Sequence, residues 1–338
     1  MSLRSSLHVL WNGARAREAV QVALDTGLLA RIAKTPGSTL GELAAAHGFV
    51  PDRLFKLLDV LETLGVVERS PKYAEGTIAQ YTLIGDALAD VQAVFGASSQ
   101  ERDRETYPWT TLHGRLGDVL AGAPGFAASE FAWPPATDAQ TARFEASMVA
   151  GLAPIRAAFG SHASTLFPPG SPLRMLDVGG GDGTLAAELV ARCPQLHVDV
   201  LNLEAVRPLF DAVRAKSAHG ERLGFVGADF LHDELPDGYD RVAFVRVLHD
   251  WPIEIAVPLL ERGIRALCAG GEVVICEEFR TPERLAAQLF WTYFLIGADT
   301  CWSRLREAGA YVQLLEARGH VATLLPGPME LVVGRAPG

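Results

Sequence analysis

The chain has 338 residues, with 49% hydrophobic and 21% charged side chains and a formal net charge of −10. This length exceeds what one compact core usually holds, and the composition is that of a folded protein, so we expect more than one domain and exclude a disordered chain. Proteins that bind nucleic acids or anionic membranes carry basic surfaces, so the acidic balance argues against both kinds of partner.

Residues 14–95 have the pattern of helices closed by a short hairpin. Thr39 and Glu42 form a capping box, in which each side chain bonds the other residue's backbone at the start of a helix. Pro51 suits the first turn of the next helix, and Gly65 suits the left-handed cap that ends it.

Two short strands are expected at residues 66–69 and 80–83, where they would complete a winged-helix domain over residues 1–95. A winged helix raises the possibility of a DNA-binding regulator. The helix that would read DNA carries two basic and three acidic side chains: Arg53, Lys56, Asp52, Asp59 and Glu62. Such a helix would repel phosphate, so we expect the domain to pack against a second subunit instead.

Residues 96–170 are expected to form a mostly helical linker that lines the substrate site. Their aromatic side chains are Tyr107, Trp109, Phe126, Phe131, Trp133, Phe144 and Phe159. A proline-rich stretch at residues 167–172 ends this segment.

In residues 171–338, strands alternate with helices. The strands are expected at residues 174–178, 197–203, 223–226, 241–247, 272–277 and 330–333, and two of the helices at 184–192 and 206–217. This alternation predicts an α/β fold with a doubly wound, mainly parallel sheet.

The strongest functional pattern is DVGGGDGT at residues 177–184, where the first of these strands turns into a helix. Open α/β sheets bind ligands at this carboxyl edge, and glycine lets a ligand approach the backbone closely. The dinucleotide fingerprint would need Gly or Ala where this chain has Thr184. The spacing GxGxG, built on Gly179 and Gly181, therefore favours a nucleoside over a pyrophosphate.

Acidic residues follow the next two strands. Glu204 could accept hydrogen bonds from a ribose diol, which both NAD and S-adenosylmethionine (SAM) carry. Asp229 and Phe230 fit an adenine, because the carboxylate can accept from the exocyclic amine while the ring stacks. The structural alternatives are an acid in the first turn of a helix for Glu204 and a solvated loop acid for Asp229.

The fourth strand leads into Arg246 and His249. A histidine at the carboxyl end of a strand can act as a general base at neutral pH, although a lone histidine is more often structural. Arg246 could pair with the carboxylate of a methionyl group. Glu277 and Glu278 end the fifth strand at the same edge, and one of them could hold the tautomer of His249.

Five features occur together and in order: LDVGGGDG, an acid after the second strand, GADF, VLHDW and CAGGEVVICEE. With them, the chain resembles the plant caffeic-acid-type and bacterial secondary-metabolite O-methyltransferases over nearly its whole length. The resemblance implies a class I, Rossmann-like methyltransferase domain at residues 171–338 and an N-terminal winged-helix dimerisation domain. It further implies an intertwined homodimer that uses SAM and releases S-adenosylhomocysteine (SAH).

The resemblance also assigns roles to single residues. The SAM site would comprise Gly179, Gly181, Glu204, Asp229, Phe230 and Arg246. His249 would be the general base, and Glu277 the acid that orients it. Phe144 and Met148 match the family pattern Phe-x-x-x-Met, whose methionine packs against the acceptor ring.

The chain departs from the family in three places. Glu204 stands where the family usually has Asp, and a second family glutamate has no clear equivalent, Glu307 being the nearest. Residues 289–302 are unusually aromatic, and we expect Trp291 and Phe294 to line a pocket for a flat, apolar acceptor. Phe290, Tyr293 and Trp302 are the other aromatic residues of this stretch.

The expected function is SAM-dependent O-methylation of a hydroxyl on a small aromatic or heteroaromatic secondary metabolite, such as an antibiotic or pigment precursor, with His249 as the base. The same fold could instead support N-methylation, hydroxylation or decarboxylation. A DNA-binding regulator and a nicotinamide dehydrogenase are the alternatives outside this family.

The four cysteines, Cys193, Cys268, Cys276 and Cys301, lie far apart and lack zinc-ligand spacing, so we expect no metal. No apolar run has the length of a signal-peptide core or a membrane span. We therefore expect a protein of the reducing cytoplasm.

Overall fold

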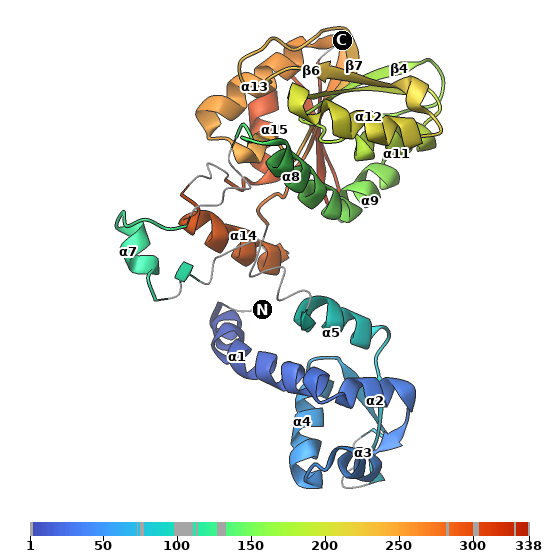
Figure 1. The fold of residues 1–338 in the computed structure, drawn as a ribbon, viewed down its shortest axis with the longest axis vertical. Coiled ribbons are helices and arrows are strands. Elements are labelled where there is room, and N and C mark those ends of the chain that lie inside the picture. Colours follow the sequence, from blue (N-terminus) through green and yellow to red (C-terminus); the bar gives the residue numbers. More distant parts are fainter. Residues whose placement is uncertain are drawn as a thin grey trace. The chain divides into compact units, whose positions relative to one another are not determined.

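The computed structural model describes residues 3–72, 74, 78–97, 111–112, 114–126, 133–281, 284–299, 304–327 and 329–336, and only the backbone of residues 3–6, 285–288 and 290. The chain divides into two compact units, Met1–Pro108 and Trp109–Gly338, whose elements are drawn in Figure 1. Outside the described residues are Tyr107, Trp109, Phe131, Cys301, Trp302 and the side chain of Phe290.

In the described part of the first unit, helices pack on a small antiparallel sheet with the strand order β1-β3-β2. The helices are α1 (Leu3–Asp25), α2 (Leu28–Lys34), α3 (Leu40–His47), α4 (Pro51–Thr63) and α5 (Ala87–Phe95), and the strands are β1 (Ser38–Thr39), β2 (Val67–Ser70) and β3 (Gln80–Leu83). The predicted hairpin is confirmed as β2 and β3. The short strand β1 was not predicted, because two residues carry no recognisable alternation.

Local signals set the helix ends of this unit as predicted. Thr39 Oγ1 accepts a hydrogen bond from the Glu42 backbone at 3.2 Å, and the Glu42 carboxylate accepts one from the Thr39 backbone at 2.8 Å. Pro51 begins α4, and Gly65 follows that helix with a φ of 76°. These contacts satisfy backbone groups that a helix end leaves unpaired.

The second unit is built on a seven-stranded sheet with the order β6-β5-β4-β7-β8-β10-β9. Its strands are β4 (Leu173–Val178), β5 (Leu196–Asn202), β6 (Leu223–Gly227), β7 (Tyr239–Val245), β8 (Leu267–Cys276), β9 (Val321–Leu325) and β10 (Leu331–Arg335). Strands β6, β5, β4, β7 and β8 run parallel, while β10 pairs antiparallel with both β8 and β9. The mainly parallel α/β sheet is confirmed; β9 was not predicted, because this edge strand is largely exposed and lacks a buried alternation.

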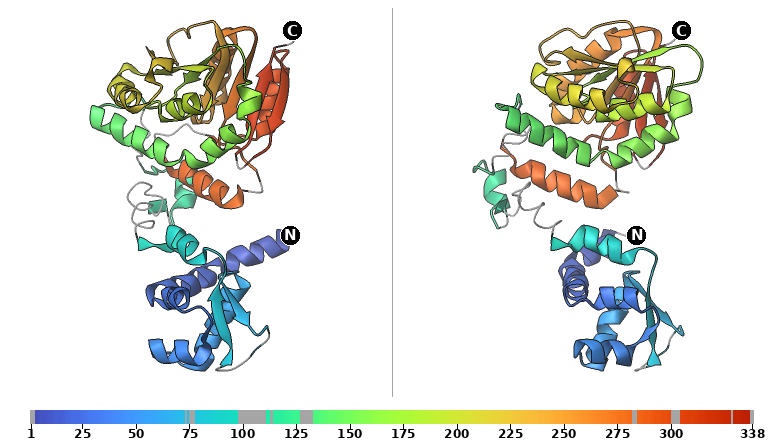
Figure 2. Two further views of the ribbon diagram at one scale, coloured as in Figure 1. Left: turned by 90° about the vertical axis from the view of Figure 1, so that its right-hand side faces the viewer. Right: turned by 45° about the vertical axis from the view of Figure 1, so that its right-hand side comes forward.

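Helices cover both faces of this sheet (Figure 2). The described helices of the second unit are α7 (Leu116–Leu120), α8 (Asp138–Ala150), α9 (Ala153–Ser161), α10 (Ala163–Leu166), α11 (Thr184–Arg192), α12 (Arg207–Lys216), α13 (Ile253–Arg265), α14 (Leu285–Gly297) and α15 (Ala308–Glu316), of which α7 and α14 lie away from the sheet (Figure 1). On one face Met175 and Val198 pack with α9 and α11, and on the other Leu176 and Val242 pack with α13 and α15. Apolar residues bury both faces, as parallel sheets require.

None of the helices in the described part of the chain is both long enough and apolar enough to cross a bilayer.

Candidate functional site

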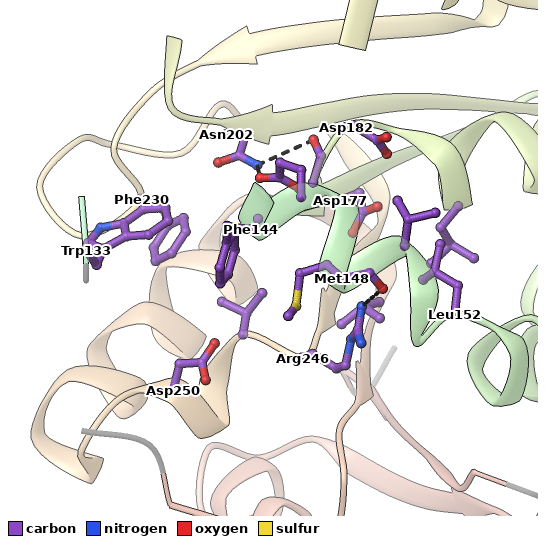
Figure 3. Close-up of a pocket in the computed structure, with 18 of the residues that line it drawn as sticks. Trp133, Phe144, Met148, Leu152, Asp177, Asp182, Asn202, Phe230, Arg246 and Asp250 are labelled. Atoms are coloured by element: carbon purple, nitrogen blue, oxygen red, sulfur yellow. Dashed lines mark hydrogen bonds between the residues drawn. The ribbon is translucent and has the colours of Figure 1, made fainter. Parts of the chain in front are cut away.

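Two adjoining cavities lie at the carboxyl ends of the parallel strands. The glycine-loop cavity, of about 90 Å³, lies between residues 179–182, helix α8 and the ends of β5 and β7 (Figure 3). The aromatic cavity, of about 220 Å³, lies between α8, α9, α14 and the loop that carries His249. Phe144, Met148, Arg246 and Asp250 line both cavities and form a shared wall.

The glycine loop takes a backbone path that other residues rarely adopt. Gly179, Gly181 and Gly183 have φ values of 71°, 61° and 82°. A Cβ on Gly179 would lie 2.8 Å from Val247 Cγ2, and one on Gly183 would lie 2.7 Å from Phe210 Cδ2. Both the conformation and the packing therefore require glycine, and the predicted Gly179 and Gly181 line the cavity.

Two buried carboxyl groups line the same cavity. Asp177, at the end of β4, is 1% exposed, and no described residue donates a hydrogen bond to either of its oxygens. Burial raises the pKa of Asp177 to about 7. Glu145, on α8, is 4% exposed; burial and the neighbouring Asp182 carboxylate raise its pKa to about 7.

Sequence reasoning missed Glu145. Its nearest side-chain donor is the amide of Asn202, at 3.5 Å from Oε1 and 57 residues away along the chain. A contact across that separation leaves no periodic or motif signal, so only the fold could bring the carboxylate to the glycine loop.

Aromatic rings close one end of the glycine-loop cavity. Phe230 stacks on Trp133 with ring centroids 5.3 Å apart, and Trp251 meets the edges of both rings. The predicted Phe230 is therefore part of the cavity wall. Trp133 was noted only as one aromatic among many, because its partner is distant in sequence.

Asp229 does not line the glycine-loop cavity. Its carboxylate accepts a hydrogen bond from the Leu231 backbone at 2.9 Å and lies 2.8 Å from Nδ1 of His232. These contacts hold the side chain in the turn after β6. Asp229 therefore lies next to Phe230 in the chain, but its carboxylate is not part of the wall of the glycine-loop cavity.

Glu204 also lies outside the cavity lining. Arg207, three residues later, binds its carboxylate with two guanidinium nitrogens, one of them at 2.9 Å. The Glu204 side chain is 67% exposed, and the hydrogen bond from Arg207 lowers its pKa. The predicted ribose acid is thus held by a local ion pair, which the sequence expectation had not considered.

Arg246 joins the two cavities. Its φ of 55° is left-handed, an uncommon conformation for a residue with a side chain, and its Nη2 donates to the Met148 carbonyl at 2.6 Å. A Cβ on Gly151 would lie 2.6 Å from Arg246 Nη1, so the glycine makes room for the guanidinium. Burial lowers the pKa of Arg246.

Apolar side chains dominate the aromatic cavity. The predicted Phe144, Met148, Trp291 and Phe294 all line it. Its polar or charged lining residues are Arg246, His249, Asp250 and Glu278. The cavity therefore combines flat apolar walls with a cluster of titratable groups at the strand ends.

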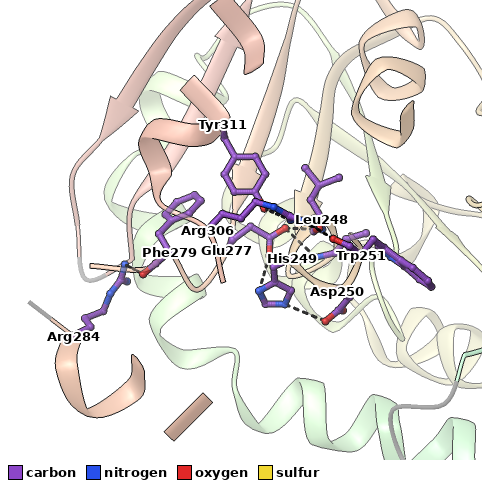
Figure 4. Close-up of polar contacts among 10 residues, drawn as sticks. Leu248, His249, Asp250, Trp251, Glu277, Phe279, Arg284, Arg306 and Tyr311 are labelled. Atoms are coloured by element: carbon purple, nitrogen blue, oxygen red, sulfur yellow. Dashed lines mark hydrogen bonds and ion pairs between the residues drawn. The ribbon is translucent and has the colours of Figure 1, made fainter. Parts of the chain in front are cut away.

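His249 lies in this cavity with a buried acid behind it (Figure 4). Its Nδ1 is 3.2 Å from Glu277 Oε2, although the two atoms are not aligned for a hydrogen bond. Glu277 is 1% exposed, and its Oε1 accepts from the backbone of Val247 at 3.1 Å and Leu248 at 2.8 Å. Burial raises the pKa of Glu277, and the nearby His249 opposes that rise. Of the two strand-end glutamates, Glu277 is the one beside the histidine.

A buried arginine fixes the loop around His249. Arg306 donates to the Leu248 carbonyl at 2.8 Å and to the Trp251 carbonyl at 2.5 Å. It also lies 3.3 Å from the Tyr311 hydroxyl. Carbonyls on both sides of His249 are therefore held by one side chain that the sequence did not single out.

Glu307 does not reach either cavity. It is exposed and pairs with Arg280, so it does not take the place of the second family glutamate. The nearby residue Leu305 does line the aromatic cavity. The two carboxylates in that lining are those of Asp250 and Glu278.

No group of three or more His, Cys, Asp or Glu side chains in the described part of the chain is arranged to hold a metal ion. Cys193, Cys268 and Cys276 carry free thiols, and Cys301 lies outside that part.

A sequence family described as an O-methyltransferase domain matches residues 128–321. The N,N-dimethyltransferase OxyT of Streptomyces rimosus is 28% identical over 287 residues, covering 82% of this chain and 79% of that protein. The 3-amino-4-hydroxybenzoate 4-O-methyltransferase of Streptomyces cremeus is 26% identical over 315 residues, covering 89% of this chain and 81% of that protein.

Among solved structures, the apo form of the SAM-dependent methyltransferase SibL is similar in fold, with a TM-score of 0.70. It is 22% identical, and the match covers 99% of each chain.

Proposed function

Because the chain belongs to the O-methyltransferase family and is a SAM-dependent methyltransferase of class I fold, we propose that its acceptor is a hydroxyl of a small aromatic or heteroaromatic metabolite. One observation carries this proposal. An apolar cavity that contains His249, with the buried Glu277 behind it, shares a wall with the glycine-loop cavity.

The glycine-loop cavity fits SAM in its residue chemistry. Buried carboxyl oxygens without hydrogen-bond donors suit a cationic ligand, and the glycines leave the backbone open to close approach. The loop backbone would hold the methionyl and ribose parts, Phe230 the adenine and Arg246 the methionyl carboxylate. Glu204 and Asp229 would join this set only on giving up their contacts with Arg207 and His232. When bound, SAM supplies an electrophilic methyl group.

His249 is the proposed general base. It takes the proton of the acceptor hydroxyl on Nε2, while the Glu277 carboxylate near Nδ1 stabilises the charge that the ring gains. A positioned base contributes about 10²–10⁴-fold to such a reaction. The shared wall would hold the acceptor oxygen toward the methyl group, and correct alignment contributes on the order of 7–11 kcal/mol at best.

A second candidate is N-methylation on the same fold, since the Streptomyces rimosus relative is named an N,N-dimethyltransferase. Two panels of acceptors distinguish O-methylation from N-methylation, one of hydroxylated aromatics and one of matched aromatic amines. Both would be incubated with methyl-labelled SAM and analysed by mass spectrometry. We expect a labelled ether from the hydroxyl panel. Label only in the amines would replace the proposal. SAM binding without any transfer would point to an acceptor outside both panels or to hydroxylase or decarboxylase chemistry.

The Arg306 contacts lead to a prediction about positioning. Arg306→Met should lower kcat by about 10–100-fold while changing the SAM dissociation constant less than threefold, because the loop carrying His249 loses both carbonyl anchors. Arg306→Lys keeps a donor and should recover part of the loss. Tyr311→Phe is the matched control, since it removes one 3.3 Å contact of the same guanidinium. A parallel fall in kcat and SAM affinity would instead indicate general damage to the fold.

We also propose that the first unit mediates a homodimer. Helix α1 exposes the apolar side chains Leu7, Val9, Leu10 and Trp11, and Trp11 is 78% exposed. Exposed apolar clusters of this kind mark interaction surfaces. The double change Leu10→Asp and Trp11→Asp should convert a dimer to a monomer in sedimentation analysis, whereas Val321→Asp, at an exposed strand position, should not. A monomeric wild-type protein would contradict the proposal.

A further inference from the structure

The glycine-loop cavity has an unbalanced charge. Its charged lining residues are the four acids Glu145, Asp177, Asp182 and Asp250 and one base, Arg246. The guanidinium of Arg246 is engaged by the Met148 carbonyl and stands at the shared wall. The cavity as a whole therefore favours a ligand with net positive charge.

Glu145 is the most unusual of these acids, because it comes from α8 and not from a strand end. It is 4% exposed, and no described residue donates a hydrogen bond to its Oε2. That oxygen would lie 2.8 Å from a Cβ on Gly181, which places it against the glycine loop. The contact of Oε1 with the Asn202 amide, at 3.5 Å, is long, and the Asp182 backbone lies close enough to the carboxyl group to lower its pKa.

A buried carboxylate without full hydrogen bonding is costly unless a cation offsets it. Arg246, the one base in the lining, is close enough to lower the pKa of Glu145 but donates no hydrogen bond to its Oε2. The cavity wall is where a ligand cation would meet that oxygen. A ligand that brings positive charge is therefore favoured, and SAM carries one positive charge more than its product SAH, the charge of the sulfonium.

We propose that Glu145 makes this cavity charge-selective, so that its carboxylate shifts the ratio of affinities toward cationic SAM and away from SAH, whose net charge is zero. The inference rests on the proposed use of SAM. The sulfonium and ammonium of SAM outweigh its single carboxylate, giving a net charge of about +1 at neutral pH by the ordinary ionisation of these groups. Transfer forms the C–O bond and breaks the C–S bond, and the electron pair that stays on sulfur removes the sulfonium charge. The attraction to Glu145 then weakens, which favours product release.

The test is calorimetric binding of SAM and of SAH to the full chain at pH 8. Glu145→Gln keeps the shape of the side chain and removes its charge. We expect the variant to weaken SAM binding about tenfold and SAH binding less than threefold, because a tenfold change matches the loss of one favourable charge interaction in a partly buried site. Glu316→Gln, an exposed acid on α15, is the matched control and should change neither affinity.

A second measurement uses the wild-type protein alone. The pKa of Glu145, which burial raises to about 7, makes the carboxylate charged at pH 8 and mostly neutral at pH 6. The preference for SAM over SAH should therefore fall on acidification. Burial also raises the pKa of Asp177 to about 7, so this carboxylate loses charge over the same range and acts in the same direction. Asp182, Asp250 and Arg246 are the other charged groups around the cavity. The part of the pH-dependent change in the SAM-to-SAH affinity ratio that is lost in Glu145→Gln is the part due to Glu145.

An unchanged SAM-to-SAH affinity ratio in Glu145→Gln would overturn the inference, as would an equal loss for both ligands. If the variant does not fold, a wild-type ratio that is the same at pH 6 and pH 8 would overturn it. Failure of the wild-type chain to bind either ligand is a different result, because it would remove the proposed cofactor itself.

Discussion

Replacement of His249 by alanine is expected to lower kcat for methyl transfer at least about a hundredfold while the SAM dissociation constant stays within about twofold. The imidazole lines the aromatic cavity but not the glycine-loop cavity, so its loss removes the proposed proton acceptor without altering the lining of the proposed SAM site. Labelled-ether formation and calorimetric SAM binding would be measured on the same preparations.

His197→Ala is a suitable control for this experiment, because that histidine is exposed on β5 and lines neither cavity. The effect should shrink for strongly acidic phenols, which ionise without help. Equal ether formation by the wild type and His249→Ala across weakly acidic acceptors would remove His249 from the chemistry and leave the methyltransferase assignment intact.

The Gly183→Ala substitution should destabilise the second unit by about 2–4 kcal/mol and abolish measurable SAM binding. Two costs combine at this position. The φ of 82° is unfavourable for any residue with a Cβ, and the new atom would lie 2.7 Å from the buried ring of Phe210. The cost is measured by denaturant unfolding monitored at the tryptophans.

Gly270→Ala separates the two costs of Gly183→Ala. Gly270 has a similar φ of 76°, but nothing lies within 4 Å of the Cβ that it would gain. Its replacement by alanine should therefore lower the free energy of unfolding by only about 1 kcal/mol, the cost of the backbone conformation, and SAM binding should be retained. Equal destabilisation by the two substitutions would show that the contact with Phe210 relaxes freely.

The sequence predicts the parts of this molecule whose causes are local. The capping box at Thr39, the turn from β4 into the glycine loop, and the parallel strands each depend on residues close together in the chain. Because these residues follow parallel strands, the sheet alone predicts that Gly179, Phe230, Arg246 and His249 lie together at its carboxyl edge. Glu204 is the opposite case, a local contact that was not predicted. Its partner Arg207 lies only three residues later, a spacing at which an ion pair can be predicted from the sequence.

The remaining site residues depend on long-range packing. Arg306 meets the carbonyl of Leu248 across 58 positions, and Glu145 meets Asn202 across 57. Neither arginine nor glutamate signals such a contact by its type or spacing. Resemblance to a family supplied Glu277 in preference to Glu278, and the structure places Glu277 at the histidine while Glu278 lines the aromatic cavity.

The shared wall limits how this protein can acquire a new acceptor. Phe144, Met148, Arg246 and Asp250 each face both cavities, so an enlarging substitution there alters the glycine-loop cavity as well. Trp291, Phe294 and Leu295 on α14 line the aromatic cavity alone. Divergence in acceptor range, by natural drift or by laboratory selection, should therefore accumulate on α14 and leave α8 nearly unchanged.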